Sequence, residues 1–230
     1  RRAEKLAELA AEFAARTAAS HLDARPGQLE TLVGDITDPS TQNRALERAV
    51  ACWGGLDLLI NNAGVGSRGR FADSSAEVLR RVMEVNFFAA AELIRLALPH
   101  LAQGRRPLIV NMGSILGHRA IPFASEYCAA KFALRGLSEA LRTELARRSI
   151  ELLVVSPGAT QTEFSANVLG GGTYPWREIS SVSAQTVART TVRAIERSKR
   201  EVFVNWRGRL LVWLNQIAPG CIDRILARYG

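Results

Sequence analysis

Three short apolar runs constrain the fold more than any other feature of this sequence. Each run ends in a turn of small or polar residues: LDLLINNAG (56–64), PLIVNMGS (107–114) and ELLVVSPG (151–158). The runs are apolar almost without interruption, which is typical of strands buried on both faces of a sheet. Stretches with helical periodicity separate them, so the chain alternates strands and helices. This alternation predicts a parallel β-sheet with helices on both faces.

The same periodicity predicts the remaining elements. Helices are expected where apolar residues recur at helical spacing: 3–19, about 39–53, 75–101, 125–148 and 183–198. Further strands are expected over 28–34 and 201–205. No repeat or linker interrupts the pattern, so residues 1–206 are predicted to form one domain, a doubly wound, Rossmann-like fold with three α/β/α layers. Ligands of such sheets bind outside the carboxyl ends of the strands.

Composition narrows the class of protein. A chain of 230 residues fits one large domain, and its formal net charge is +8. All but three of the 30 basic residues are arginine, but they are spread along the chain without interleaved aromatic residues. Nucleic-acid binding is therefore not expected. We interpret the charge as solvated surface with some attraction for a phosphate-bearing cofactor.

The cysteine, histidine and hydropathy patterns exclude further classes. The cysteines are odd in number and lack metal-ligand spacing, which predicts reduced thiols in a cytoplasmic protein. The three histidines are scattered, so no metal site is expected. No apolar run reaches the length of a membrane-spanning helix, and the N-terminus is charged rather than signal-like.

Polar and small residues follow four of the predicted strands, at the edge where ligands bind. They are Asp35 with Ile36, Asn61 with Ala63 and Gly64, Ser114, and Pro157-Gly158 with Thr162. Small residues at these points let the backbone approach a flat ligand closely. Simpler roles remain open, since Asn61 can merely close a turn and Asp35 can cap a helix.

Tyr127 and Lys131 lie four residues apart on the predicted helix 125–148, so their polar tips reach the same face. Reduction of a ketone requires a proton donor at oxygen while hydride arrives at carbon. A tyrosine with its ordinary pKa near ~10 is a poor proton relay at neutral pH, and a nearby ammonium lowers that pKa by favouring the phenolate. A serine hydroxyl such as that of Ser114 can hold the same substrate oxygen.

Taken in order, these motifs resemble those of the short-chain dehydrogenase/reductase family over residues 1 to about 206. The matching residues are Tyr127 and Lys131 for its YxxxK motif, Ser114 for its catalytic serine, Asn86 in VMEVNFF for its helix asparagine, and 61–64 for its NNAG motif. The resemblance implies an oxidoreductase that transfers hydride between a nicotinamide dinucleotide and a carbonyl or alcohol.

The resemblance also implies a role for each matched residue. Tyr127 is the expected acid/base, and Lys131 is expected to bind the nicotinamide ribose and to lower the tyrosine pKa. Ser114 is expected to orient the substrate, and Asn86 to hold a water of the proton relay. Cofactor contacts are expected from the residues that follow the strands: Asp35 at the adenine, Ile36, Asn61, Ala63 and Gly64 elsewhere on the dinucleotide, and Pro157, Gly158 and Thr162 at the nicotinamide.

One motif of the family is absent. The Gly-rich phosphate turn TGxxxGxG does not occur, and RRAEKL (1–6) resembles the segment after the family's second strand. We therefore expect the N-terminal β-α-β unit to lie upstream, and this chain alone to be poorly soluble and to bind the cofactor weakly. Arg1 and Arg2 stand where the family places residues that face the adenosine ribose. A guanidinium there pairs with a 2′-phosphate, so NADP(H) is favoured and NAD(H) remains possible.

Other activities are compatible with these motifs. A dinucleotide sensor or scaffold without turnover would keep the fold, although binding alone does not require Tyr and Lys at this spacing. An epimerase or dehydratase would use the same cofactor. A medium-sized, apolar small-molecule carbonyl or alcohol substrate is favoured, because the loops 65–74 and 115–124 and the insertion 163–182 mix apolar and polar residues. His118 lies in the loop after Ser114, where a surface position is favoured and a substrate contact remains open.

Residues 207–230 are expected to form an amphipathic tail. Its two apolar stripes are Leu210, Trp213, Leu214 and Ile217 before Pro219, and Ile222, Ile225, Leu226 and Tyr229 after it. Stripes this rich must be covered by something. A homodimer or homotetramer interface, or the wall of the substrate pocket, is favoured. Docking on an anionic membrane surface is the alternative.

Overall fold

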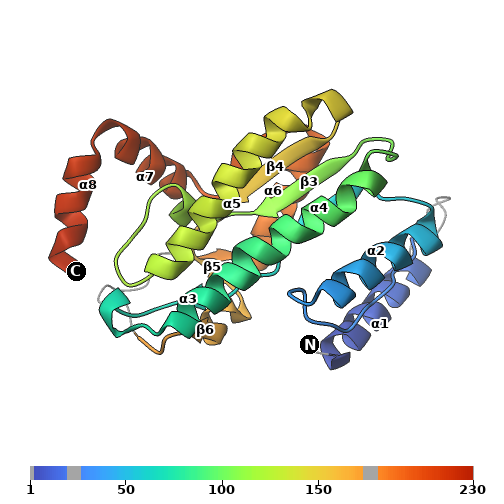
Figure 1. Cartoon of the computed structure of the whole chain (residues 1–230), viewed down its shortest axis with the longest axis horizontal. Helices are drawn as coiled ribbons and strands as arrows, with labels where there is room; N and C mark the ends of the chain where they lie inside the picture. The colour runs from blue at the N-terminus through green and yellow to red at the C-terminus, as the bar shows by residue number, and fades with distance from the viewer. Residues whose placement is uncertain (1–2, 20–26, 173–180, 230) are drawn as a thin grey trace.

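A four-stranded parallel sheet forms the centre of the molecule (Figure 1). The computed structural model describes residues 3–19, 27–172 and 181–229. In sheet order the strands are β1 (Leu58–Asn61), β3 (Leu108–Met112), β4 (Glu151–Ser156) and β8 (Glu201–Phe203). All three pairings are parallel. The Rossmann-like α/β fold and the strands predicted from residue 56 onward are thereby confirmed.

Helices alternate with these strands as the periodicity predicts. In the described part of the chain they are α1 (Ala3–Ala19), α2 (Pro39–Trp53), α3 (Ala76–Met83), α4 (Ala89–Leu101), α5 (Ser125–Glu144), α6 (Ala184–Glu196), α7 (Trp206–Ile217) and α8 (Pro219–Leu226). None of these helices is long and apolar enough to span a membrane. Short pieces complete the fold: β2 (Gly66–Ser67) pairs with β6 (Val168–Leu169), β5 (Thr160–Gln161) pairs with β7 (Val182–Ser183), and η3 (Ile115–Gly117) and η5 (Glu163–Asn167) are 3-10 turns.

Two apolar clusters cover opposite faces of the sheet, because successive residues of a strand point to opposite sides. One cluster joins Ile109, Leu152 and Val154 to Leu93, Ile94 and Ala97 of α4. The other joins Val110, Leu153 and Val155 to Ala194 of α6. Figure 1 shows α4 and α5 in front of the sheet and α6 behind it. The three α/β/α layers follow from this division.

The predicted start of the second helix is confirmed at Asp38. The Asp38 carboxylate accepts a hydrogen bond from the backbone N–H of Ser40 at 2.9 Å, and Pro39 occupies the first turn. Gly54 ends the helix with a φ of 78°, a left-handed conformation that glycine adopts without steric cost.

The predicted strand over 28–34 is wrong. No strand is formed by residues 27–34 of the described chain, and Leu29 and Val33 are 37% and 50% exposed. An apolar segment becomes a strand only where a neighbour supplies backbone hydrogen-bond partners. β1 lies at the edge of the described sheet with no strand beyond it. The segment instead runs as an extended connection into the turn at Asp35, whose carbonyl accepts from the Asp38 N–H at 3.0 Å.

The predicted helix 75–101 forms with one interruption. Residues Glu84–Phe88 make a π-helical turn between α3 and α4, and Asn86 lies within it. A π turn breaks the regular ladder of backbone hydrogen bonds and is found frequently at functional sites. The interruption therefore falls at the one residue of this helix that the sequence assigns to catalysis.

Leu153 tests this account of the core. Leu153 is fully buried in β4, so Leu153→Ala is expected to lower the free energy of unfolding by about 2–5 kcal/mol, through lost transfer energy and the cavity left behind. Leu9→Ala on α1 is the matched control, because Leu9 is 50% exposed, and its effect should stay within about 0.5 kcal/mol. Denaturant unfolding of both variants measures the difference, and equal losses would contradict the assigned core.

Candidate active site

The sequence-predicted site residues gather where β1, β3 and β4 end. Asn61 is the last residue of β1, Ser114 follows β3, and Pro157 follows β4. The strands are parallel, so their carboxyl ends meet at one edge of the sheet, where doubly wound folds bind ligands. Helix α5 packs against β4 and η3 and carries Tyr127 and Lys131 to the same edge.

Lys131 is the most buried cation of the site. It is only 5% exposed, and its Nζ donates a hydrogen bond to the Met112 carbonyl at the end of β3, at 2.8 Å. Burial lowers the pKa of the Lys131 ammonium to about 8, because desolvation penalises the charged form. The same Nζ lies 5.7 Å from the centroid of the Tyr127 ring. The expected Tyr–Lys pair is therefore brought together, with the cation beside the ring.

Gly117 explains how η3 comes so close to this pair. A Cβ built on Gly117 would lie 2.8 Å from the Lys131 carbonyl oxygen, so no larger residue fits without a shift. Ser114, immediately before η3, is 8% exposed, and its Oγ accepts a hydrogen bond from the Leu116 N–H at 3.1 Å. The predicted substrate-orienting serine thus sits on a turn packed directly against α5.

Asn86 ties its π turn to the segment after β1. Its Oδ1 accepts from the Val65 N–H at 2.8 Å, and its Nδ2 donates to the Val65 carbonyl at 2.7 Å. A Cβ on Gly64 would lie 3.0 Å from this Oδ1 and 3.9 Å from the Lys131 Nζ. Gly64 of the NNAG motif therefore lies between Asn86 and Lys131, where only a small residue fits.

Phe164 covers Tyr127 from the predicted substrate insertion. The two rings meet edge to face with centroids 5.7 Å apart. Thr162 is exposed, and its side chain caps η5 by accepting from the Phe164 N–H at 3.2 Å. Thr162 thus positions Phe164, in addition to the nicotinamide contact expected of it. Tyr174 and Trp176 of the same insertion lie outside the described residues.

The Pro157-Gly158 turn packs between η3 and the start of α7. The Pro157 carbonyl accepts from the Ile115 N–H at 3.0 Å. A Cβ on Gly158 would lie 3.0 Å from Nδ2 of Asn205, the residue that caps α7. The turn predicted to line the nicotinamide side therefore lies beside Ser114 and links the site to the C-terminal helices.

A small hollow lies at the end of β1. It is lined by Ile36, Ile60, Asn61, Asn62, Ala63, Val85, Ala89, Ala90 and Leu93. Three predicted cofactor residues, Ile36, Asn61 and Ala63, are thus brought together. The Asn61 side chain points inward and donates to Asn111 Oδ1 at 2.8 Å, so Asn61 offers the hollow its backbone rather than its amide. Small and apolar walls of this kind suit one part of a dinucleotide.

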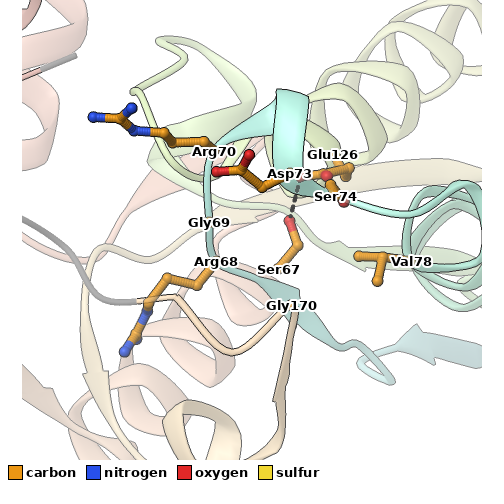
Figure 2. Close-up of a pocket in the computed structure, with 9 residues that line it drawn as sticks. All are labelled: Ser67, Arg68, Gly69, Arg70, Asp73, Ser74, Val78, Glu126 and Gly170. Carbon is orange, nitrogen blue, oxygen red and sulfur yellow. Dashed lines mark hydrogen bonds between the residues drawn. The ribbon is translucent and has the colours of Figure 1, made fainter.

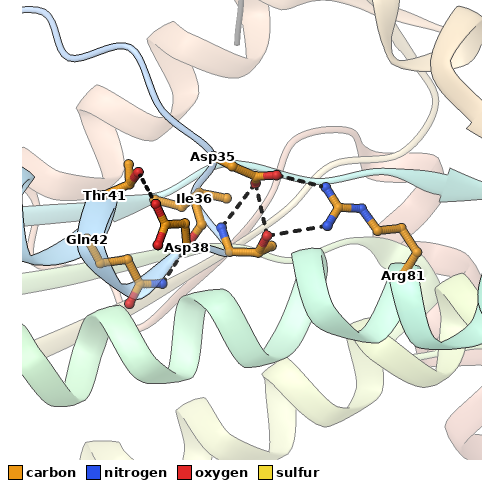
Figure 3. A network of polar contacts seen from close by, with 7 residues as sticks. Asp35, Ile36, Asp38, Thr41, Gln42 and Arg81 are labelled. Carbon is orange, nitrogen blue, oxygen red and sulfur yellow. Dashed lines mark hydrogen bonds and ion pairs between the residues drawn. The ribbon is translucent and has the colours of Figure 1, made fainter.

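Asp35 stands at the rim of this region in a polar network (Figure 3). Its carboxylate accepts from the Thr37 backbone N–H at 3.1 Å and pairs with Arg81 of α3 at 3.3 Å. Arg81 also donates to the Thr37 hydroxyl. The adenine contact expected of Asp35 would thus come from a carboxylate already held in place. Arg1 and Arg2, expected at the adenosine ribose, lie outside the described residues.

A buried polar contact at the start of α5 was not predicted from the sequence (Figure 2). Ser67 of β2 donates to the Glu126 carboxylate at 3.0 Å and accepts from the Tyr127 backbone N–H at 3.2 Å. Both Ser67 and Glu126 are 2% exposed. Ser67 thereby accepts from an N–H in the first turn of the helix that carries Tyr127, where the N–H groups have no partner within the helix. The one sequence feature that could have indicated this contact is the position of Glu126 next to Tyr127.

The surface position expected for His118 is wrong. His118 is 8% exposed, and its Nε2 lies 3.0 Å from Ser156 Oγ and 3.0 Å from Glu201 Oε1. Burial alone would raise the pKa of Glu201, but hydrogen bonding to His118 and nearby positive charge hold that pKa below its usual value. His118 therefore links the last residue of β4 to the first residue of β8, and these two strands are neighbours in the sheet.

Comparisons with known proteins agree with this geometry. A model of the short chain dehydrogenases matches residues 3–170. The chain is 34% identical to dehydrogenase/reductase SDR family member 7B of Bos taurus, over 99% of this chain and 71% of that protein. It is 36% identical to 3-ketodihydrosphingosine reductase of Bacteroides thetaiotaomicron, over 61% of this chain and 52% of that protein.

A solved structure gives the same result. A short chain dehydrogenase from Burkholderia cenocepacia J2315 in complex with NADP is similar with a TM-score of 0.72 and 26% identity, covering 84% of this chain and 76% of that one. A Rossmann-like sheet with a Tyr–Lys pair at its carboxyl edge is the architecture that these short-chain dehydrogenases share with this chain. The chain belongs to the short-chain dehydrogenase/reductase family. It spans about half to seven tenths of the length of the two relatives named above.

The buried ammonium makes a prediction about stability and pH. The pKa of Lys131 is about 8 in the folded protein against 10.5 for an ordinary lysine. Below pH 8 both states carry the proton, and the folded state bears the full cost of burying the charge. Between pH 8 and pH 10.5 only the unfolded chain keeps the proton on Lys131, so the free energy of unfolding rises with pH. Relative to Lys131→Met, the wild-type free energy of unfolding should rise by about 3 kcal/mol across this window.

Denaturant titrations of both proteins between pH 8 and pH 10 measure this slope. Lys199→Met is the matched control, because Lys199 is exposed in the turn that follows α6. The Lys199→Met curve should run parallel to that of the wild type. A constant difference between wild type and Lys131→Met at all pH values would contradict the assignment.

Proposed function

We propose that the full-length protein is an NADP(H)-dependent oxidoreductase that interconverts a carbonyl compound and its alcohol. The observation that carries the proposal is the buried Lys131 ammonium beside the Tyr127 ring, on one helix at the carboxyl edge of the sheet. Burial of a cation is costly and needs a compensating role. Favouring the phenolate of a tyrosine that exchanges protons with substrate is such a role.

Each residue of the site has a task in this proposal. The Tyr127 hydroxyl donates its proton to the substrate oxygen in reduction and takes it back in oxidation. Ser114 Oγ already accepts from the Leu116 N–H, which leaves its own proton to donate to the same oxygen. The Asn86 amide is committed to Val65, so a part in the proton relay falls to its main chain in the π turn. The dinucleotide, when bound, supplies or accepts the hydride.

An apolar substrate fits the surroundings of these groups. Phe164 lies edge-on to Tyr127, and Ile115 follows Ser114 directly, so apolar surface adjoins both polar groups. The reductase from Bacteroides thetaiotaomicron is named for a keto compound, which supports a carbonyl substrate here. We therefore assign substrate selection to the segment around Phe164 and to η3.

Tyr127→Phe tests the acid/base. The substitution keeps the ring and removes the hydroxyl, so kcat should fall by roughly 100-fold or more while the dinucleotide still binds. Turnover is measured by NADPH oxidation with a panel of apolar ketones, and binding by calorimetry. Unchanged dinucleotide affinity is the control for folding. A variant with near wild-type kcat would remove Tyr127 from the mechanism.

The cofactor preference is tested by comparing NADPH with NADH. Pairing of Arg1 and Arg2 with the 2′-phosphate should favour NADPH in kcat/KM by about tenfold or more, since charge-assisted hydrogen bonds are among the stronger ones. The double variant Arg1→Ala/Arg2→Ala should lose most of this preference. Arg16→Ala on α1 is the control, since Arg16 pairs with Glu12 on the exposed face of that helix. Equal kcat/KM values for the two dinucleotides in the wild type would contradict the prediction.

A further inference from the structure

Helix α7 packs on the domain through its small face. Gly208 and Val212 are buried, and Leu211 and Asn215 are half-buried on the same side. A Cβ built on Gly208 would lie 2.7 Å from Ile115 Cγ2, so the helix approaches η3 as closely as a glycine allows. The closest approach of α7 to the protein is thus made at its glycine, and Leu211 is the one large apolar residue on this side.

The opposite face of α7 is bulky and apolar, and the described residues of the chain leave it exposed. It consists of Trp206 (70% exposed), Leu210 (42%), Trp213 (54%), Leu214 (39%) and Ile217 (63%). A helix on a globular domain ordinarily turns such a face toward the core and its polar face outward. Here the arrangement is reversed. The described residues therefore leave the bulky stripe exposed, and an apolar surface of this kind suits a partner outside the domain.

Arginines border this apolar face. At about 100° per residue, Arg207 and Arg209 fall on its two flanks, and the Arg207 guanidinium lies 5.6 Å from the Trp206 ring centroid. Arg224 and Arg228 add positive charge on and just after α8, where Ile225 is 51% exposed. Asp223 is the one acidic residue among 205–229. Its carboxylate is already paired with Arg119 at 2.6 Å.

Arg119 also fixes the two helices to the domain. It donates to Asn215 of α7 at 2.9 Å and to Asp223 of α8 at 2.6 Å, and its side chain is 15% exposed. Figure 1 shows α7 and α8 together at one end of the molecule, away from α1 and α2. The apolar face of α7 with its bordering arginines, here named the α7–α8 face, is thus held in a defined orientation.

We propose that the α7–α8 face docks the protein onto a membrane surface rich in anionic lipid. Exposed tryptophans, leucines and an isoleucine suit the boundary between headgroups and acyl chains, and arginines on the flanks suit lipid phosphates. A second copy of the chain is the weaker candidate, because a two-fold contact would oppose the same arginines with no free carboxylate between them. The docking is peripheral, and it goes beyond the oxidoreductase activity proposed above.

Vesicle co-sedimentation of the full-length protein tests the proposal. The probes are phosphatidylcholine vesicles with and without phosphatidylglycerol, at low and at high salt. Strong binding is expected only to the anionic vesicles at low salt, because each basic residue near such a surface contributes about fivefold in affinity and salt screens this attraction. Failure to bind anionic vesicles at low salt, or equal binding to neutral ones, would overturn the proposal.

Matched variants connect the binding to this face. Trp213→Glu should weaken vesicle binding by about tenfold or more, since it removes an interfacial tryptophan and adds a negative charge. Trp53→Glu is the control, because Trp53 on α2 is 51% exposed against 54% for Trp213. Arg207→Gln/Arg209→Gln should weaken binding to anionic vesicles, and the exposed pair Arg147→Gln/Arg148→Gln should not.

Light scattering separates membrane docking from self-association. The proposal expects wild type and Trp213→Glu to have the same oligomeric state in solution. A Trp213→Glu protein that loses a dimer yet still binds anionic vesicles would overturn it. Thermal unfolding, measured alongside, shows that the variant is folded. A second substitution on the same face, Ile217→Glu, should reproduce the loss if Trp213→Glu proves unstable.

Discussion

The hydrogen bond from the Lys131 ammonium to the Met112 carbonyl is the interaction on which the candidate site depends. A buried cation is tolerated only where a well-placed acceptor offsets part of its lost hydration. The acceptor here is the last residue of β3, and the donor is on α5, so the charge fixes the helix to the end of the sheet. The close approach of Gly117 to Lys131 then brings in the turn that follows Ser114.

A second set of buried hydrogen bonds also connects the sheet to α5. Asn61 of β1 donates to Asn111 of β3, and Asn111 donates to Ser138 of α5 at 2.9 Å. Ser138 in turn donates to the Leu134 carbonyl within its own helix. Each amide has its partner, so this polar chain costs little to bury and specifies how β1, β3 and α5 are aligned. The carboxyl end of β1, where we propose that the dinucleotide binds, and the Tyr–Lys helix are therefore positioned by one network.

Local patterns of apolar and polar residues in the sequence were sufficient to predict much of this architecture. The apolar runs predicted β1, β3 and β4, and four-residue spacing placed Tyr127 and Lys131 on one helical face. Contacts that depend on distant pairing could not be predicted. Ser67 meets Glu126 across 59 residues, and His118 meets Ser156 across 38, with no periodicity to signal either. The segment 28–34 had the composition of a strand, but a strand also needs a neighbour with unpaired backbone groups.

The C-terminal helices show a different limit of sequence patterns. Periodicity identified the apolar stripe of α7 correctly, but it could not show which face contacts the domain. Gly208 determines the contacting face. Because glycine has no side chain, α7 can lie directly on Ile115 through this residue, and the tryptophans then lie on the outer face. η3 is also the turn that follows Ser114 and packs against Lys131. Any surface that the α7–α8 face contacts is therefore connected to the candidate active site through a single turn.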